Sequence, residues 1–387
     1  MSIGRAQWSD LPRELLELIA DRLQTKTDVT RFRSVCESWR FSVLPFQNRI
    51  VLPTKVPHLG PPHFHVPYLG LPHLHVPYLG PPHLRDTSLL LTETTVYFLS
   101  PPAASISSSS SRLWGWLLKL KEGQQQLGQL HLVHPLSPLQ IHPLPDSFPK
   151  VINALQFRVF ELAKSYTLQF SNLDHCNYKV GLSQNPDCPS LMIVASGVLW
   201  HLELGHDRWI AIEDTISQLS YEDVIPYQGK FCAVDEFGRT VLFDSNLTIT
   251  EIASVNSTLC YGDYKNLVES NGELLLVDTY CTRKENTHNG GRKTFKVQKF
   301  RVFKLKLDQK RWVELQSLDD QILFLGEDCS FSVSAHNFGG CKGNCIIYTD
   351  RDSCFNVFNL DDGSVSPVTL HLEYANMFNP PPILAKA

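Results

Sequence analysis

The residues best suited to hold a metal ion lie near the C-terminus. Cys341 and Cys345 flank a Lys-Gly-Asn turn, and Cys329, His336 and Cys354 could supply further ligands. Structural zinc sites take four thiolate or imidazole ligands, which usually come from two tightly spaced pairs. No second tight pair accompanies this one, and buried thiols around a glycine turn explain the same residues. We therefore assign no metal-binding residue.

Catalytic residues are no more clearly indicated. The sequence contains neither the Gly-x-Ser-x-Gly elbow of a serine nucleophile nor the Gly-x-x-x-x-Gly-Lys-Ser/Thr loop that cradles phosphates. The carboxylate pairs Asp319-Asp320 and Asp361-Asp362 stand among residues typical of turns, where solvent surrounds them. We predict no catalytic residue and no cofactor.

A basic stretch is the remaining chemical feature. Between Phe300 and Leu307 basic and apolar residues mostly alternate, as in a half-buried strand with a solvated face, and the break at Val302-Phe303 is compatible with a bulge. A contact patch for an acidic partner and a nuclear import signal are the alternatives. Its basic members, with Asp308 as counter-charge, are Arg292, Lys293, Lys296, Lys299, Arg301, Lys304, Lys306, Lys310 and Arg311.

The composition narrows the function classes. Of 387 residues 43% are hydrophobic, so a sizeable core can form, and the net charge of −4 argues against a general nucleic-acid binder. The N-terminus lacks an apolar signal core and no run is apolar enough to span a membrane. Ten scattered cysteines do not form a disulfide framework. We expect a protein of the nucleus or cytoplasm.

The first elements that the sequence predicts are helices. Ser9-Asp10-Leu11-Pro12-Arg13-Glu14 is typical of a helix start, and Thr27 or Asp28 can cap a second helix. Because so small a unit cannot bury its apolar surface alone, it must either pack on the rest of the chain or bind a partner. The apolar residues at helical spacing are Leu15, Leu18, Ile19 and Leu23, then Val29, Phe32, Val35 and Cys36, with Trp39 extending the line.

Three decapeptides rich in proline and histidine follow, beginning at Val56, Val66 and Val76. Proline at two or three positions of each unit blocks helices and sheet ladders, which predicts an extended or disordered spacer. Six histidines could bind a metal ion, although no acidic or cysteine ligand lies nearby and repeat expansion explains them. They are His58, His63, His65, His73, His75 and His83.

From about Leu89 onward, short apolar runs alternate with turns. Asn271-Gly272 is typical of a two-residue hairpin, and Asp235 to Arg239 and Asp361 to Ser364 each join two such runs. Strands at this spacing over nearly the whole remaining chain predict antiparallel sheets. A β-propeller explains both the length and the repetition, and a pair of sandwich domains is the alternative. Predicted strands include 190–195, 197–202, 230–235, 240–244 and 273–278.

Two sets of motifs resemble a known family. Leu11-Pro12-Arg13-Glu14-Leu15-Leu16 followed by Val35-Cys36-Glu37-Ser38-Trp39 resembles an F-box, with the departure that Thr30 stands where the family often has leucine. The C-terminal part is similar to the KIB-type, Kelch-like propeller of plant F-box proteins of the SKIP-like group. The motifs that carry this second similarity are Tyr227 to Asp235, Leu267 to Val277, Trp312 to Leu315, Phe324 to Gly326 and Gly340 to Tyr348.

The resemblance implies a substrate-recognition subunit of a Skp–cullin–F-box ubiquitin ligase that is not itself an enzyme. Its partners would be a Skp-type adaptor, through it a cullin–RING ligase, and a target protein, with no nucleic acid and no membrane. A scaffold outside the ligase, or a propeller enzyme with carboxylates and aromatic residues in a central pocket, are the alternatives. The predicted fold class is α+β multidomain, with an F-box at 8–47, a linker at 48–87 and a six- or seven-bladed propeller at 88–375. The predicted adaptor-binding residues are Leu11, Pro12, Leu15, Leu16, Ile19, Leu23, Val29, Phe32, Val35, Cys36 and Trp39.

Overall fold

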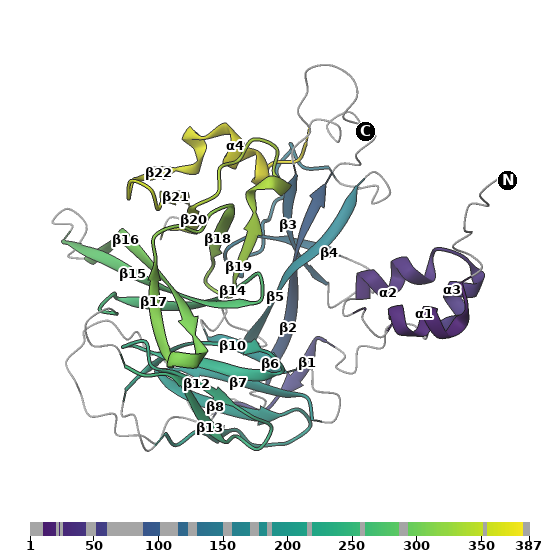
Figure 1. The fold of residues 1–387 in the computed structure, drawn as a ribbon, viewed down its shortest axis with the longest axis horizontal. Coiled ribbons are helices and arrows are strands. Elements are labelled where there is room, and N and C mark those ends of the chain that lie inside the picture. Colours follow the sequence, from purple (N-terminus) through teal and green to yellow (C-terminus); the bar gives the residue numbers. More distant parts are fainter. Residues whose placement is uncertain are drawn as a thin grey trace. The chain divides into compact units, whose positions relative to one another are not determined.

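The chain forms two compact units, residues 1–51 and residues 52–387, which are described separately. The computed structural model (Figure 1) describes residues 11–20, 23, 26–43, 52–59, 88–100, 115–122, 130–149, 157–170, 178–183, 188–214, 219–255, 260–285, 293–350 and 354–381. Most of the histidine repeats and the serine-rich segment 105–111 lie outside these residues. In the described part no helix is long and apolar enough to cross a membrane.

The first unit consists of the short helices α1 (Arg13–Ala20), α2 (Lys26–Arg33) and α3 (Glu37–Ser42). The carbonyl of Pro12 accepts hydrogen bonds from the backbone N–H groups of Leu15 and Leu16, at 3.1 Å each, and so begins α1 as the sequence predicts. Thr27 and Asp28 lie inside α2 and do not cap it. Cys36 caps α3 with an extended backbone, so the apolar line that seemed continuous to Trp39 is divided between two helices.

The second unit is a β-propeller of five sheets, or blades (Figure 1). Every pairing is antiparallel except that between β18 and β20. The first blade contains β1 (Thr54–Val56), β2 (Leu89–Ser100), β3 (Trp116–Glu122), β4 (Leu130–Val133) and β5 (Arg158–Phe170). The second contains β6 (Lys179–Ser183), β7 (Ser190–Ala195), β8 (Val198–Glu203) and β9 (Ile210–Ala211). The third contains β10 (Tyr221–Tyr227), β11 (Lys230–Asp235), β12 (Thr240–Phe243) and β13 (Ile249–Ala253).

The fourth blade contains β14 (Tyr264–Ser270), β15 (Glu273–Glu285), β16 (Lys293–Lys306) and β17 (Arg311–Leu315). The fifth contains β18 (Gln321–Leu325), β19 (Ser330–Ser334), β20 (Cys345–Thr349), β21 (Phe355–Asn359) and β22 (Val365–Pro367), and the short helix α4 (Leu372–Ala375) follows it. The inner strands β5, β6, β10, β14 and β19 lie next to one another in this order, and β19 lies next to β5. The ring of blades is therefore closed.

The prediction of six or seven blades is wrong, because the described strands form five. Dividing chain length by the usual size of a blade overcounts here, since the strands of the first blade are drawn from as far apart as residues 54 and 170, and β15 and β16 are unusually long. The predicted α+β class is also wrong, since the described helices are few and short and the protein is mainly β.

Local turn chemistry in the propeller follows the predictions. Asn271 and Gly272 join β14 to β15 with positive φ angles of 52° and 77°, a conformation that glycine and asparagine tolerate best. Asp235 ends β11, and its Oδ1 accepts hydrogen bonds from the N–H groups of Phe237 (3.0 Å) and Arg239 (2.9 Å), which shape the turn into β12. The predicted hairpins at 235–239 and 361–364 and the predicted strands are confirmed.

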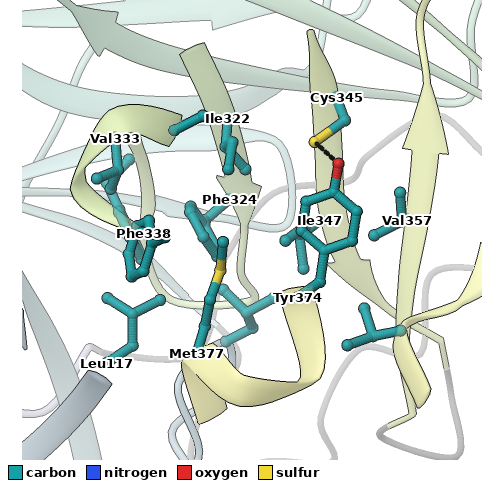
Figure 2. Close-up of a cluster of buried hydrophobic side chains, with 14 of the residues drawn as sticks. Leu117, Ile322, Phe324, Val333, Phe338, Cys345, Ile347, Val357, Tyr374 and Met377 are labelled. Atoms are coloured by element: carbon teal, nitrogen blue, oxygen red, sulfur yellow. Dashed lines mark hydrogen bonds between the residues drawn. The ribbon is translucent and has the colours of Figure 1, made fainter. Parts of the chain in front are cut away.

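The first and last blades are joined by an apolar cluster (Figure 2). Leu117 of the first blade packs with Phe324 and Ile347 of the fifth, and Tyr374 and Met377 from the C-terminal helical segment complete the cluster. These side chains are almost fully buried. None of the described strands is shared between the two ends of the ring, and this side-chain packing helps to hold the ring closed.

A buried ion pair reinforces the same junction. Lys119 Nζ of β3 lies 2.6 and 2.7 Å from the carboxylate oxygens of Asp328, in the turn between β18 and β19. Lys119 Nζ also donates to the carbonyl of Ser137 at 3.2 Å, and Asp328 accepts from Ser165 Oγ at 2.8 Å. The two charges thus compensate each other, and the first blade supplies the further hydrogen-bonding groups that burial of an ion pair requires.

The start of the predicted linker is attached to the propeller. Thr54–Val56 pairs with Leu89 to Leu91 of β2, and Leu59 is buried. The indole Nε1 of Trp209 donates a hydrogen bond of 2.8 Å to the carbonyl of Pro57. The linker boundaries at 48 and 87 stay a prediction, because residues 60–87 lie outside the described part.

Candidate functional site

The helical unit has a small interior of its own. Leu16 of α1 and Val29 and Phe32 of α2 are buried, and the ring of Phe32 lies 4.5 Å from the ring of Trp39, centroid to centroid. Helix α3 therefore packs on α2 through aromatic contact. These residues hold the unit together.

Two arginines that fall off the apolar line tie the helices to each other. Arg33 Nη1 donates to the carbonyl of Arg40 at 2.8 Å and also to the carbonyl of Val43. Arg40 Nε donates back to the carbonyl of Arg33 at 3.3 Å. The exchange satisfies carbonyl groups at the ends of α2 and α3, which a short helix leaves without partners.

Much of the remaining apolar surface of the helical unit is exposed. On α1, the exposed fractions are 47% for Leu15, 62% for Leu18 and 38% for Ile19, and these residues lie three and four positions apart on one helix face. Val35 is 53% exposed and Phe41 is 74% exposed. Several large apolar side chains on so small a unit indicate an interaction surface. We call Leu15, Leu18 and Ile19 the α1 face.

The eleven predicted adaptor-binding residues thus fall into groups. Leu15, Ile19 and Val35 are exposed, as is Pro12, whereas Leu16, Val29 and Phe32 are buried, and the half-buried members are Leu11, Leu23, Cys36 and Trp39. The set as a whole stays a prediction. Leu18 and Phe41 were missing from it, although the spacing of Leu18 from Leu15 was a signal for including it.

Within the basic stretch, some charges are already compensated. Arg301 forms a two-point ion pair with Glu314, in which its Nε donates to Oε1 at 2.7 Å, and Lys304 pairs with Glu273. The hydrogen bonds from Arg301 lower the pKa of Glu314. Val302 and Phe303 are paired regularly with β15, so the bulge expected there is absent. Both are buried because they face different clusters on the two sides of the blade.

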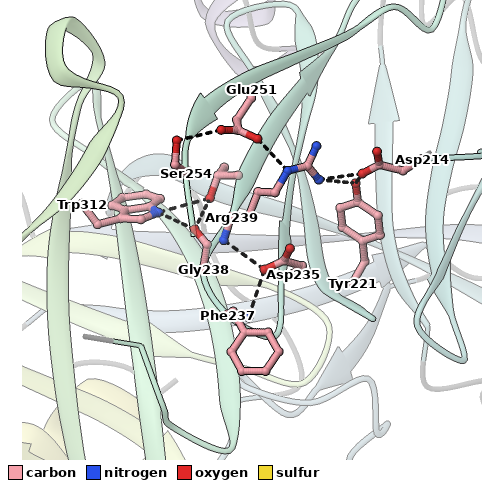
Figure 3. A network of polar contacts seen from close by, with 10 residues as sticks. Asp214, Tyr221, Asp235, Phe237, Gly238, Arg239, Glu251, Ser254 and Trp312 are labelled. Atoms are coloured by element: carbon pink, nitrogen blue, oxygen red, sulfur yellow. Dashed lines mark hydrogen bonds and ion pairs between the residues drawn. The ribbon is translucent and has the colours of Figure 1, made fainter. Parts of the chain in front are cut away.

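A second polar network lies between the third blade and its neighbours (Figure 3). Arg239 Nη1 donates to Asp214 at 2.6 Å and Arg239 Nε donates to Glu251 at 2.7 Å, while Tyr221 donates its hydroxyl to Asp214 at 2.7 Å. Burial alone would lower the pKa of Arg239, but its hydrogen bonds with both carboxylates raise it. Arg239 thus holds both carboxylates, and through it Asp214 is tied to the third blade.

Two carboxylates on an inner strand are used to bind backbone. Asp223 of β10 accepts a hydrogen bond of 2.8 Å from the N–H of Leu267, and its neighbour Glu222 accepts one from the N–H of Lys265. Both amides belong to β14, the inner strand of the next blade. Burial raises the pKa of Glu222 to about 7. The two carboxylates thus accept hydrogen bonds from backbone N–H groups on the edge of β14 that pairs with no other described strand.

The cysteines considered for zinc are engaged with protein oxygens. Cys341 Sγ donates to the carbonyl of Glu373 at 3.2 Å, and Cys345 Sγ lies 3.7 Å from the hydroxyl of Tyr374. Burial raises the pKa of Cys341 to about 12 and that of Cys345 to about 11, so both are protonated thiols at neutral pH. No cluster of metal-ligating side chains occurs among the described residues.

A helical unit with an exposed apolar face, followed by a closed propeller, defines a two-part protein built for interaction. Comparison with known families agrees with this division. Residues 8–48 match the F-box domain and residues 88–365 match the KIB1-4 beta-propeller. The chain belongs to the family of F-box proteins with a KIB1-4 beta-propeller, as the resemblance predicted.

Relatives in Arabidopsis thaliana match along nearly their whole lengths. The F-box protein SKIP23 is 31% identical, over 97% of this chain and 94% of its own. A putative F-box protein is also 31% identical, over 93% of this chain and 95% of its own. A putative F-box/kelch-repeat protein is 25% identical, over 97% of this chain and 98% of its own. The two parts therefore occur together in these relatives.

Proposed function

We propose that this protein is the substrate-recognition subunit of a Skp–cullin–F-box ubiquitin ligase in the nucleus or cytoplasm. The helical unit docks to a Skp-type adaptor, and the propeller binds the protein to be ubiquitinated. Its contribution to the reaction is positional: it raises the concentration of the target near a ubiquitin-loaded enzyme. The observation that carries the proposal is the α1 face, in which three large apolar side chains of an F-box helix are left exposed.

The burial pattern supports a different role for the exposed and for the buried members of the predicted adaptor-binding set. Leu15, Ile19 and Val35, together with Leu18 and Phe41, contact the adaptor directly. The buried residues shape that surface from below. Leu16, which is fully buried, therefore contributes to adaptor binding by keeping the helices folded.

The test removes the α1 face without disturbing the interior. Leu15, Leu18 and Ile19 are about half exposed, so covering each in a complex is worth about 1 kcal/mol, and together about 3 kcal/mol. The triple variant Leu15→Ala, Leu18→Ala, Ile19→Ala should then bind a Skp-type adaptor about a hundredfold more weakly. Titration of the purified full chain with the adaptor measures this, and circular dichroism confirms that the helices persist.

Two comparison variants make the result specific. Leu130→Ala with Leu139→Ala removes leucines of the first blade that are 55% and 51% exposed, and should leave adaptor affinity unchanged. Leu11→Ala with Pro12→Ala tests the start of α1 in a pull-down. If the triple variant keeps full affinity while folded, this docking surface is wrong.

The ligase role needs a separate measurement in cells. Proteins that bind the propeller should accumulate when the cullin is inhibited and when the α1 face is removed. If partner half-lives do not respond to either change, the protein acts as a scaffold outside the ligase. Proximity labelling with the α1 face disabled would trap the targets for identification.

A further inference from the structure

The fourth blade carries a projecting arm. Figure 1 shows β15 and β16 running out beyond the neighbouring strands. Strand β14 pairs with β15 only as far as Thr279, and β17 pairs with β16 only from Val302 onward. Residues 280–285 and 293–299 therefore pair only with each other among the named strands, as a two-stranded ribbon. We call this part of the hairpin the β15–β16 ribbon.

The ribbon contains a bulge that aligns two lysines. Tyr280 pairs with Lys299, but the next pair is Cys281 with Val297, so Gln298 is an extra residue. Thr282 then pairs with Lys296, and Thr282 Oγ1 donates to the carbonyl of Lys296 at 3.3 Å. Opposite residues share a face of a ribbon, and so do residues two apart in a strand. Since Tyr280 and Thr282 share a face, Lys296 and Lys299 share it as well.

The charges on this ribbon differ from those within the blade. Arg301 and Lys304 are paired with Glu314 and Glu273. Lys296 and Lys299 are exposed, and neither forms an ion pair with any residue that the structure describes. The hydrogen bonds from Arg301 lower the pKa of Glu314 most, and the nearby charge of Lys299 lowers it further. Arg301 already bonds both carboxylate oxygens of Glu314.

The sequence around the ribbon also carries a positive charge. From Arg283 to Lys306 nine lysine and arginine residues accompany one acidic residue, Glu285, in a chain whose net charge is −4. A projection with this charge attracts an acidic partner and directs its approach. The negative charge of the rest of the chain opposes nucleic acids and anionic membranes, which present extended negative surfaces.

From these observations we infer that the β15–β16 ribbon is a docking surface for an acidic, extended segment of a partner protein. Lys296 and Lys299 lie one two-residue step apart along the ladder, about 7 Å, which is also the separation of alternate side chains in an extended peptide. Carboxylates at every second position of such a peptide can therefore meet both lysines. That the partner is a ubiquitination target rests on the proposed function, whereas the binding itself does not.

The test uses the purified full chain and a short fluorescein-labelled peptide in which Glu and Thr alternate, with fluorescence anisotropy as the readout. Wild-type protein should bind this peptide and should not bind the same peptide with Gln in place of Glu. Lys296→Glu with Lys299→Glu should weaken binding about tenfold or more. The matched control, Lys55→Glu with Lys230→Glu, changes the net charge equally at exposed lysines of the first and third blades and should leave binding unchanged.

Three results would overturn the inference. Equal weakening by both double variants would mean that only net charge matters. Undiminished binding by the Lys296→Glu, Lys299→Glu variant would place the site elsewhere. Tighter binding of a single-stranded oligonucleotide or of anionic phosphatidylserine vesicles would mean that the class of partner is wrong. A Skp-type adaptor pull-down with the same variants separates the proposals, because undiminished peptide binding by the Lys296→Glu, Lys299→Glu variant with adaptor binding intact refutes only this one.

Discussion

The junction between the first and last blades of the propeller contains a buried ion pair as well as an apolar cluster. Lys119 and Asp328 have side chains that are 0% and 4% exposed, and they join the first blade to the fifth. Replacing Asp328 by Asn leaves the Lys119 ammonium buried without a counter-charge. Removing one partner of a buried pair costs about 3–5 kcal/mol. In this variant the Ser137 carbonyl still accepts a hydrogen bond from Lys119, whereas Lys119 and the Ser165 hydroxyl lose the charged carboxylate as their acceptor.

The double variant Lys119→Met with Asp328→Leu tests whether the charges or the packing of these two side chains determine the loss of stability. Neither charge then remains to be buried, so the double variant should be more stable than either single variant, with a coupling of about 2 kcal/mol or more. Urea unfolding followed by tryptophan fluorescence measures this, since Trp116 is buried in the first blade. Additive losses in the two single variants would refute the reasoning, because they would show that the charges act independently.

Three further predictions concern the propeller. Burial raises the pKa of Glu222 from 4.5 to about 7, so between these pH values the folded state holds a proton that the unfolded state has lost. The free energy of unfolding should therefore fall by at most about 3 kcal/mol as the pH rises from 4.5 to 7. Urea titrations at several pH values measure this, and Glu222→Gln should flatten the dependence. Trp312→Phe removes the 2.8 Å hydrogen bond from the indole to the Gly238 carbonyl and should cost about 1–3 kcal/mol, with Trp209→Phe as a comparison at the Pro57 contact. Gly115→Ala would bring a Cβ to 1.9 Å from the ring of Phe98, so its melting temperature should drop, whereas Gly205→Ala, with no neighbour within 4 Å, should lose only what its positive φ costs.

The features that could be predicted from the sequence are those with a local physical cause. Asn271-Gly272 predicts a hairpin because few residue pairs tolerate two positive φ angles in succession. Pro12 predicts a helix start because its ring fits the first turn. Such signals lie within a few residues, so they are readable without knowing what packs on them.

The features that could not be predicted depend on distant residues. Lys119 and Asp328 are 209 positions apart, and neither has a neighbour that indicates burial. The bulge at Gln298 follows from the register between two strands, and the alternation of residue types suggested a bulge at Val302-Phe303 instead. The predicted number of blades was wrong for a similar reason, because that number depends on how the whole chain divides its length between strands and loops.

Leu15 and Leu16 show how far the sequence alone can predict the candidate site. They are adjacent residues of the same type within one motif, and the resemblance to an F-box placed both in the predicted adaptor-binding set. The structure leaves one about half exposed and buries the other fully, and the main helix contact of α1 within the unit is with α3. Motif resemblance supplied the predicted set, and only the packing of the helices divides it into exposed and buried residues.

The two interaction surfaces proposed for this chain differ in the force that drives binding. The α1 face is apolar, so its binding depends on area removed from water and changes little with ionic strength. The β15–β16 ribbon acts through exposed lysines, whose attraction to carboxylates is screened within about 8 Å at physiological salt. Raising the salt concentration should therefore release an acidic partner from the ribbon while the adaptor stays bound. If both proposals hold, the chain can exchange its targets without leaving the ligase.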